Sequence, residues 1–253
     1  MKRFSLTRLA ALILSLAATA VTLQSCDDDP SPVPESEYIV GLVTVRPGNG
    51  ESVTLQLNDS TTIIPTNLKA SPFGKKEVRA LTQCSIVERL NALEWEAYIF
   101  TLDSIRTKLP VATAGADNDR LFGNDPVEIV RDWTTCAEDG YLTLRIRTRW
   151  GSAKSIHYVN LLTGTNKDNV YELELRHNAQ GDTDGRMADA LVAFDLRQLP
   201  KTDSGTATIR LTWQSYSGKK SAEFALRYRG KSEATSGALQ EATDDSLMQG
   251  VVQ

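Results

Sequence analysis

The sequence predicts an all-β protein in which a small closed barrel is followed by an antiparallel β-sandwich. Apolar and polar residues alternate from Tyr38 almost to the end of the chain, as they do in strands with one buried face. Turn-forming clusters divide this alternation into short segments, and residues 106–126 interrupt it with loop-forming sequence. Two runs of strands separated by a break indicate two β modules.

The first module covers residues 38–110. Alternating segments between Tyr38 and Leu102 are separated by turn clusters such as Asn58-Asp59-Ser60, and the segment 90–94 links the last two strands. About five strands result, which suits a small closed barrel. A short helix over 85–97 is the alternative there, because Ile86, Leu90 and Leu93 recur at helical spacing.

The second module covers residues 127–230, after a linker at 111–126. Its strands have one apolar face and one charged face, as between Leu142 and Trp150, where arginines alternate with aliphatic residues. About seven such strands predict two antiparallel sheets, each with one wet side, that pack as a sandwich. Residues 231–253 form a polar tail that we expect to be loosely ordered.

The N-terminal segment predicts export and lipidation. Three basic residues precede an apolar stretch over 9–23 that is shorter than the roughly 20 residues of a membrane-spanning helix. The run Leu23-Gln24-Ser25-Cys26 has the pattern of a lipoprotein signal. We expect residues 1–25 to be cleaved and Cys26 to carry the lipid, with an ordinary signal peptide as the alternative.

A tether is predicted between the lipid and the barrel. Residues 26–37 are rich in proline and polar groups, which is typical of an extended linker. The acidic run Asp27, Asp28 and Asp29 directly follows the cysteine. We interpret it as a sorting signal, with a solvated spacer as the alternative. The anchor is therefore expected at the outer membrane, on either the periplasmic or the surface side.

The composition excludes a bulk attraction to nucleic acid. Without residues 1–25, the chain has 25 Lys and Arg against 32 Asp and Glu, so its side-chain charge is −7. Cys84 and Cys136 remain after lipidation, in different modules. A disulfide and two isolated thiols both fit the sequence.

Short stretches of the second module, together with the lipoprotein signal, resemble the NigD-like lipoproteins of Bacteroidota. The resemblance implies an OB-type barrel at the N-terminus and a β-sandwich at the C-terminus, and it carries over no catalytic residue. The stretches that carry it are Gly123-Asn124-Asp125-Pro126-Val127, His157-Tyr158-Val159-Asn160-Leu161 and Glu172-Leu173-Glu174-Leu175-Arg176-His177-Asn178.

The chemistry of the chain favours structural roles. His157 and His177 are its two histidines and lack the close spacing of a zinc site, so we expect a structural role and a hydrogen bond from His177 to the following turn. The acidic loops lack the spacing of an EF-hand. We predict no metal, cofactor or catalytic residue.

An arginine stripe on one strand is the other candidate. Arg145, Arg147 and Arg149 could bind an anionic glycan, but we expect cross-strand ion pairs with Glu172 and Glu174 instead.

These observations predict a non-enzymatic envelope lipoprotein that binds a glycan or a protein. One alternative is a hydrolytic envelope enzyme with a site between the modules. The other is a bacteriocin-associated immunity or protective protein, which the name of the resembling family suggests.

Overall fold

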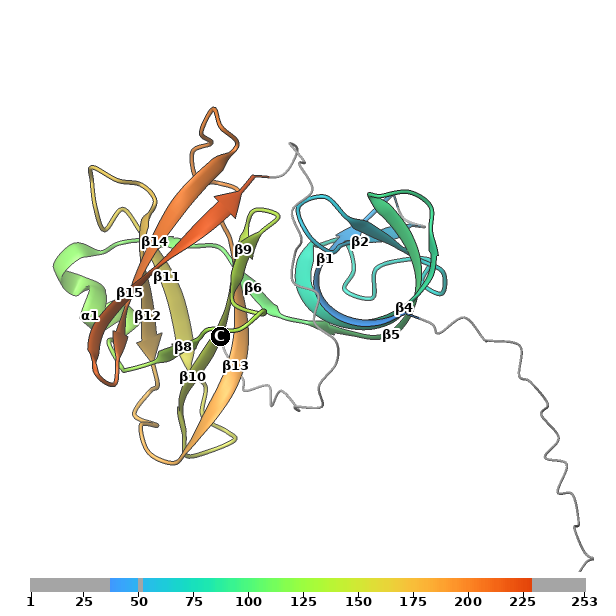
Figure 1. The fold of residues 1–253 in the computed structure, drawn as a ribbon. Coiled ribbons are helices and arrows are strands. Elements are labelled where there is room, and N and C mark those ends of the chain that lie inside the picture. Colours follow the sequence, from blue (N-terminus) through green and yellow to red (C-terminus); the bar gives the residue numbers. More distant parts are fainter. Residues whose placement is uncertain (1–36, 50–51, 229–253) are drawn as a thin grey trace, which may run out of the picture. The chain divides into compact units, whose positions relative to one another are not determined.

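The computed structural model describes residues 37–49 and 52–228, which form a barrel and a sandwich within one compact unit (Figure 1). The predicted signal peptide, Cys26, Asp27–Asp29, nearly all of the tether and the C-terminal tail lie outside the described residues. The described part contains no helix that is both long enough and apolar enough to span a bilayer.

Five strands close the barrel in the order β1-β2-β3-β5-β4. The pairs are antiparallel except for β3 and β5, which run parallel. The number of strands is as predicted, and the stretch 85–97 forms a hairpin between two strands instead of a helix. The strands are β1 (Tyr38–Pro47), β2 (Val53–Gln56), β3 (Thr62–Pro65), β4 (Val78–Arg89) and β5 (Glu94–Ser104).

The alternating residues of these strands fill the barrel. Ile39, Val43 and Val45 point inward from β1 and meet Leu55 and Ile63 from the neighbouring strands, all of them buried. Each fully buried aliphatic side chain of this kind contributes about 1.5–3 kcal/mol by leaving water. The predicted period of two therefore sets which side of each strand becomes the core.

Two sheets form the sandwich, as predicted. One has the order β6-β13-β10-β8, with β9 also paired to β10, and the other has the order β15-β14-β12-β11-β7. The first sheet contains β6 (Arg106–Lys108), β8 (Glu128–Val130), β9 (Cys136–Glu138), β10 (Tyr141–Trp150) and β13 (Arg186–Asp195). The second contains β7 (Val111–Ala112), β11 (Tyr158–Thr163), β12 (Glu172–Asn178), β14 (Thr206–Ser215) and β15 (Gly218–Arg227).

The sandwich begins earlier than the sequence suggests. We expected the barrel to reach residue 110 and a linker to fill 111–126, but β6 pairs with β13 and β7 pairs with β11. Both pairs are parallel, as is β12–β14, so the sheets are not purely antiparallel. The segment after β7 holds a 3-10 turn, η2 (Gly115–Asp117), and one short helix, α1 (Asn118–Phe122).

Apolar and polar contacts join the barrel to the sandwich. Leu42 and Ile105 share a small buried cluster with Leu191 and Ala193 of β13. Beside it lies Arg79 of β4, whose side chain is fully buried. The Arg79 guanidinium donates to Thr44 Oγ1 of β1 at 2.8 Å and to Thr143 Oγ1 of β10 at 3.4 Å.

Candidate functional site

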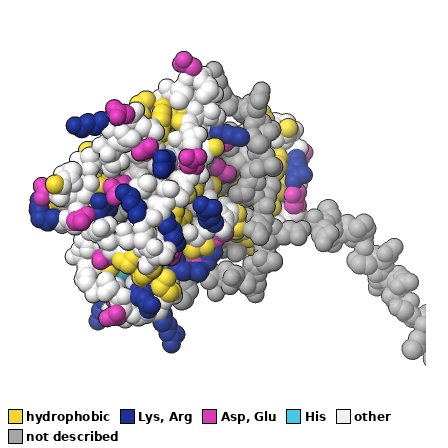
Figure 2. Space-filling view, turned by 60° about the vertical axis from the view of Figure 1, so that its left-hand side comes forward, with side chains coloured by type: hydrophobic (Ala, Val, Ile, Leu, Met, Phe, Trp, Pro, Cys, Tyr) yellow, Lys and Arg dark blue, Asp and Glu magenta, His cyan; other side chains and the backbone are white. Residues whose placement is uncertain are grey.

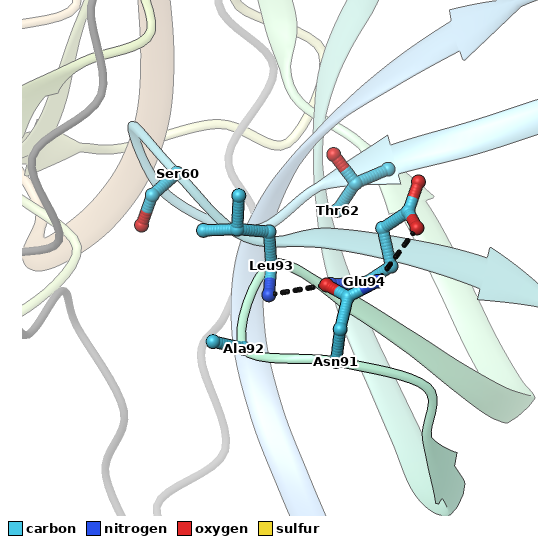
Figure 3. A pocket seen from close by; sticks show the side chains of 6 residues that line it. All are labelled: Ser60, Thr62, Asn91, Ala92, Leu93 and Glu94. Carbon is cyan, nitrogen blue, oxygen red and sulfur yellow. Dashed lines mark hydrogen bonds between the residues drawn. The ribbon is translucent and has the colours of Figure 1, made fainter.

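A pocket of about 650 Å³ lies at one end of the barrel (Figure 3). Its volume is within the range of small-molecule sites, and it is open to solvent. The side chains that line it come from the β2–β3 connection, the start of β3, the β4–β5 loop and the start of β5. They are Ser60, Thr62, Asn91, Ala92, Leu93 and Glu94.

The parallel pairing of β3 with β5 creates this pocket. Its register sets Thr62 opposite Glu94, and the Thr62 amide donates to the Leu93 carbonyl oxygen at 2.7 Å. The turn before β3 and the loop before β5 are therefore held side by side. The sequence predicts both connections, but no sequence pattern predicts that the two connections lie side by side.

Asparagine side chains fix both connections. Asn91 Oδ1 accepts hydrogen bonds from the amides of Leu93 and Glu94, at 2.8 and 3.0 Å, and Asn91 Nδ2 donates to Glu94 Oε2 at 2.9 Å (Figure 3). Asn58 Oδ1 does the same for the amides of Ser60 and Thr61. Such side-chain turns hold a loop in one conformation, and a preorganised loop would lower the entropy cost of binding a ligand.

The pocket offers hydroxyl, amide and carboxylate groups beside an apolar wall. Glu94 and Asn91 are exposed, and the Leu93 side chain is 43% exposed. Leu93 and Ala92 supply apolar surface on the side facing Ser60 (Figure 3). A carboxylate next to an apolar wall suits a neutral ligand with several hydroxyl groups, because a ligand hydroxyl can donate to the Glu94 carboxylate.

A chain of hydrogen bonds runs from the pocket to the sandwich. Thr62 Oγ1 donates to Gln56 Oε1 at 2.9 Å, and the same oxygen accepts from Arg46 Nη1 at 2.6 Å. Arg46 Nη2 reaches Asp139 in the turn between β9 and β10. The Asp139 amide in turn donates to Asp59 Oδ1 in the connection that precedes the pocket, at 2.9 Å.

The two histidines are buried against each other. His157 Nδ1 lies 2.9 Å from His177 Nε2, and the two side chains are 0% and 1% exposed. The His157 ring also packs against Trp150 in a tilted arrangement, with a centroid distance of 4.3 Å. The predicted hydrogen bond from His177 to the following turn is wrong. His157 is the histidine that lies near this turn, with its Nε2 3.5 Å from Asp182 Oδ2.

Burial keeps both imidazoles neutral. Burial, together with the neighbouring His157, lowers the pKa of His177 to about 4. Burial also lowers the pKa of His157, against the opposing effect of Asp182. One ring must donate to the other, so the pair depends on complementary tautomers. This geometry supports the structural role that the sequence predicts for both residues.

The arginine stripe forms ion pairs, but not with the expected strand. Arg145 and Arg147 both contact Asp189 of β13, and Arg145 also contacts Asp132. Arg149 donates to the carbonyl oxygen of Gly185 at 3.0 Å. The prediction of pairs with Glu172 and Glu174 is wrong because β12 belongs to the opposite sheet, whereas β13 is the neighbour of β10. On the face seen in Figure 2, basic and acidic side chains intermingle.

Acidic side chains of the loops form hydrogen bonds and ion pairs within the fold. Asp182 accepts hydrogen bonds from the amides of Gly151 and Ser152, at 2.9 and 3.2 Å, and Asp119 pairs with Arg176. Within residues 37–49 and 52–228, no three His, Cys, Asp or Glu side chains gather as they would around a metal ion.

Both cysteines of the two modules are free thiols. Cys84 is buried in the barrel and Cys136 lies on β9 of the sandwich. Burial raises the pKa of Cys84 to about 11 and that of Cys136 to about 12. Neither thiol is therefore a nucleophile at neutral pH.

Two family models match the chain, one for each module. The NigD-like N-terminal OB domain matches residues 42–105, and the NigD-like C-terminal beta sandwich domain matches residues 109–226. None of the curated proteins matches.

Several crystal structures are similar to this fold. A toxin-related protein from Parabacteroides distasonis is 28% identical, over 76% of this chain and 94% of its own, with a TM-score of 0.65. A NigD-like immunity protein from Bacteroides caccae is 19% identical, over 73% of this chain and 90% of its own, with a TM-score of 0.54. A Bacteroides fragilis protein described as a lipoprotein is 15% identical, over 76% and 99%, with a TM-score of 0.55. At these identities, the last two show a shared fold alone.

Proposed function

This chain belongs to the NigD-like family, and on that premise we propose that it is a lipid-anchored, non-enzymatic envelope protein whose barrel pocket binds a neutral glycan. The observation that carries the proposal is the pocket between the β2–β3 connection and the β4–β5 loop. OB-type barrels often bind oligosaccharides near the loop between their fourth and fifth strands, which is the position of Asn91–Leu93.

The groups in the pocket favour a neutral sugar over an acidic one. Glu94 is the carboxylate of the lining, and it would repel an anionic residue while accepting hydrogen bonds from sugar hydroxyls. Leu93 offers apolar surface for the C–H face of a pyranose ring. A non-catalytic role is supported by the histidines, since both imidazoles are buried in the sandwich and neither can reach a solute in the barrel pocket.

A screen of neutral oligosaccharides against the mature protein tests this proposal. We expect Glu94→Gln to weaken binding about 10-fold or more, since hydrogen bonds to charged groups contribute about 1.5–3 kcal/mol. Glu88→Gln is the matched control, because Glu88 is an exposed carboxylate of the same hairpin outside the lining. Equal affinities of the two variants, or a screen without hits, would reject the pocket as a glycan site.

Lipidation of Cys26 and location at the outer membrane are separate parts of the proposal. They rest on the signal sequence at 1–25 and on the acidic run Asp27–Asp29. Metabolic labelling with an alkyne fatty acid should mark the wild-type protein and leave Cys26→Ser unmarked. Protease treatment of intact cells then distinguishes the surface side from the periplasmic side.

A protective role towards a toxin is the second candidate. It is favoured by the 28% identity to a protein described as toxin-related in Parabacteroides distasonis. Deleting the gene and measuring sensitivity to neighbouring strains tests it. Unchanged sensitivity would remove this candidate and leave the glycan proposal untouched.

A further inference from the structure

Three aromatic side chains form an exposed cluster on the outside of the barrel, away from the pocket lining. Tyr38 of β1 and Tyr98 and Phe100 of β5 are 44%, 48% and 53% exposed. The ring centroids of Tyr38 and Phe100 are 5.6 Å apart, and those of Tyr98 and Phe100 are 5.3 Å apart. We call these three residues the aromatic face.

Strand register explains why the three rings share one side. Ile39, Cys84 and Ile99 lie in register across β1, β4 and β5 and point into the core, so their neighbours in sequence point outward. The register shift between Gln83 and Cys84 leaves Phe100 without a paired residue on β4. Tyr98 and Phe100 are two residues apart on β5, so the alternation of the strand exposes both on one side.

The aromatic face has the composition of a membrane interface. Its rings carry no charge, and the two tyrosines add hydroxyl groups to apolar bodies; the Tyr38 hydroxyl donates to Gln83 Oε1 at 3.0 Å. Tyrosine and other amphipathic aromatic side chains concentrate where hydrocarbon meets water. Glu37 and Arg89 beside this face form an ion pair with each other, and Glu96 of β5 lies opposite Glu88 of β4 at its border.

The position of the face in the chain determines what it can reach. Tyr38 follows Cys26 by 12 residues. Twelve residues span about 40 Å when fully extended, and about 20 Å on average when flexible. A lipid on Cys26 would thus keep the aromatic face close to the bilayer at a high effective concentration, at which a weak contact becomes occupied.

We propose that the aromatic face docks on the lipid bilayer beside the anchor and orients the barrel against it. This inference rests on the lipidation of Cys26 that belongs to the proposed function. It is independent of the glycan pocket. Three partly exposed rings would not hold the protein on a membrane alone, because stable attachment needs an acyl anchor in addition.

The test supplies the anchor artificially, so that it does not depend on lipidation. The mature chain from residue 27, with an N-terminal histidine tag, is attached to phosphatidylethanolamine–phosphatidylglycerol vesicles that contain a nickel-chelating lipid. A polarity-sensitive dye is placed at Thr101→Cys, next to Phe100, or at Lys219→Cys on the sandwich as a control; both positions are exposed.

We expect the emission of the dye at residue 101 to shift to the blue on vesicles, and that of the dye at residue 219 to stay unchanged. Replacing Tyr38, Tyr98 and Phe100 by serine should abolish the shift, whereas Leu121→Ser, at a site 49% exposed in α1, should preserve it.

Three outcomes would overturn the proposal, and the first needs no folded triple variant. One is an unshifted dye at residue 101 on vesicles. Another is a blue shift that already exists without vesicles or grows with protein concentration, because the face would then be covered by the chain itself or by a second copy. The third is a shift produced by soluble neutral oligosaccharide instead of vesicles. Failure of alkyne labelling at Cys26 would instead count against the lipid anchor of the proposed function.

Discussion

His157 Nδ1 lies 2.9 Å from His177 Nε2 in the interior of the sandwich, where neither side chain meets solvent. The contact joins the loop before β11 to the end of β12. Trp150 packs against His157, and Asp125 and Asp182 are the nearby carboxylates. The hydrogen bond between the two rings can persist only while at least one imidazole is neutral and can accept a hydrogen bond from the other.

Acid should therefore weaken the fold. The pKa of His177 is about 4 in the folded protein and near 6.5 when unfolded, so the unfolded state binds more protons between these values. The free energy of unfolding should fall as pH drops from about 6.5 to 4, by on the order of 3 kcal/mol.

Urea titrations across this pH range, on the wild type and on His177→Asn, measure the effect. Burial raises the pKa values of Asp59 and Glu138, which changes stability in the opposite direction, so the difference between the two proteins is the relevant quantity. If the difference in unfolding free energy between the two proteins does not vary with pH, the lowered pKa of His177 is contradicted.

Gly123 should be far less replaceable than Gly74. Both have a positive φ, of 76° and 75°. A Cβ on Gly123 would lie 2.6 Å from the His177 carbonyl oxygen, whereas a Cβ on Gly74 would meet nothing within 4 Å. We expect Gly74→Ala to cost about 1 kcal/mol of backbone strain and Gly123→Ala to cost clearly more. Thermal melts of the two variants measure the stability that each loses. Equal losses would mean that the backbone around residue 123 shifts to accommodate the Cβ.

Arg79 should behave as a buried charge at the junction of barrel and sandwich. Its Nη2 lies 3.6 Å from Glu138 Oε2. Arg79→Met should destabilise the protein by about 3–5 kcal/mol, because Glu138 is left without its buried partner. Adding Glu138→Leu should recover much of this loss. Urea unfolding measures both variants, and a cost below about 1 kcal/mol for Arg79→Met would show that the pair is dispensable.

Cys84 and Cys136 should resist thiol reagents in the folded protein. Their raised pKa values keep both as thiols, and only the thiolate reacts. We expect labelling at about pH 8 to be slow in buffer and fast in urea. A reductant should leave the melting temperature unchanged. A lower melting temperature in the reductant would indicate a disulfide and contradict the two free thiols.

The sequence predicts the positions of the strands better than it predicts which strands pair with each other. Alternation identifies the barrel strands and the faces of β10, because burial on one side leaves a period of two. It misses β6 and β7, which have three and two residues and are too short to show a period. The sequence also predicts, wrongly, that the arginines of β10 pair with β12, because both strands show the same alternation of apolar and charged residues. Tertiary packing instead makes β13, with Asp189, the neighbour of β10.

The candidate site is hidden from the sequence for the same reason. Its two connections are predicted as turns or links, and their asparagines fit that role. Their meeting depends on the parallel register of Thr62 with Glu94, which joins segments about thirty residues apart. The contact of His157 with His177 likewise follows from the pairing of β11 with β12 and from no local pattern.

The central claim is that the barrel pocket binds a neutral glycan. Amide correlation spectra of the mature protein, titrated with the best neutral oligosaccharide from the screen, test it most directly. We predict that the perturbed amides are those of Ser60, Thr62 and Asn91–Glu94, and that the sandwich amides around His157 and His177 do not move. Perturbations confined to the sandwich, or to the aromatic face, would contradict the account.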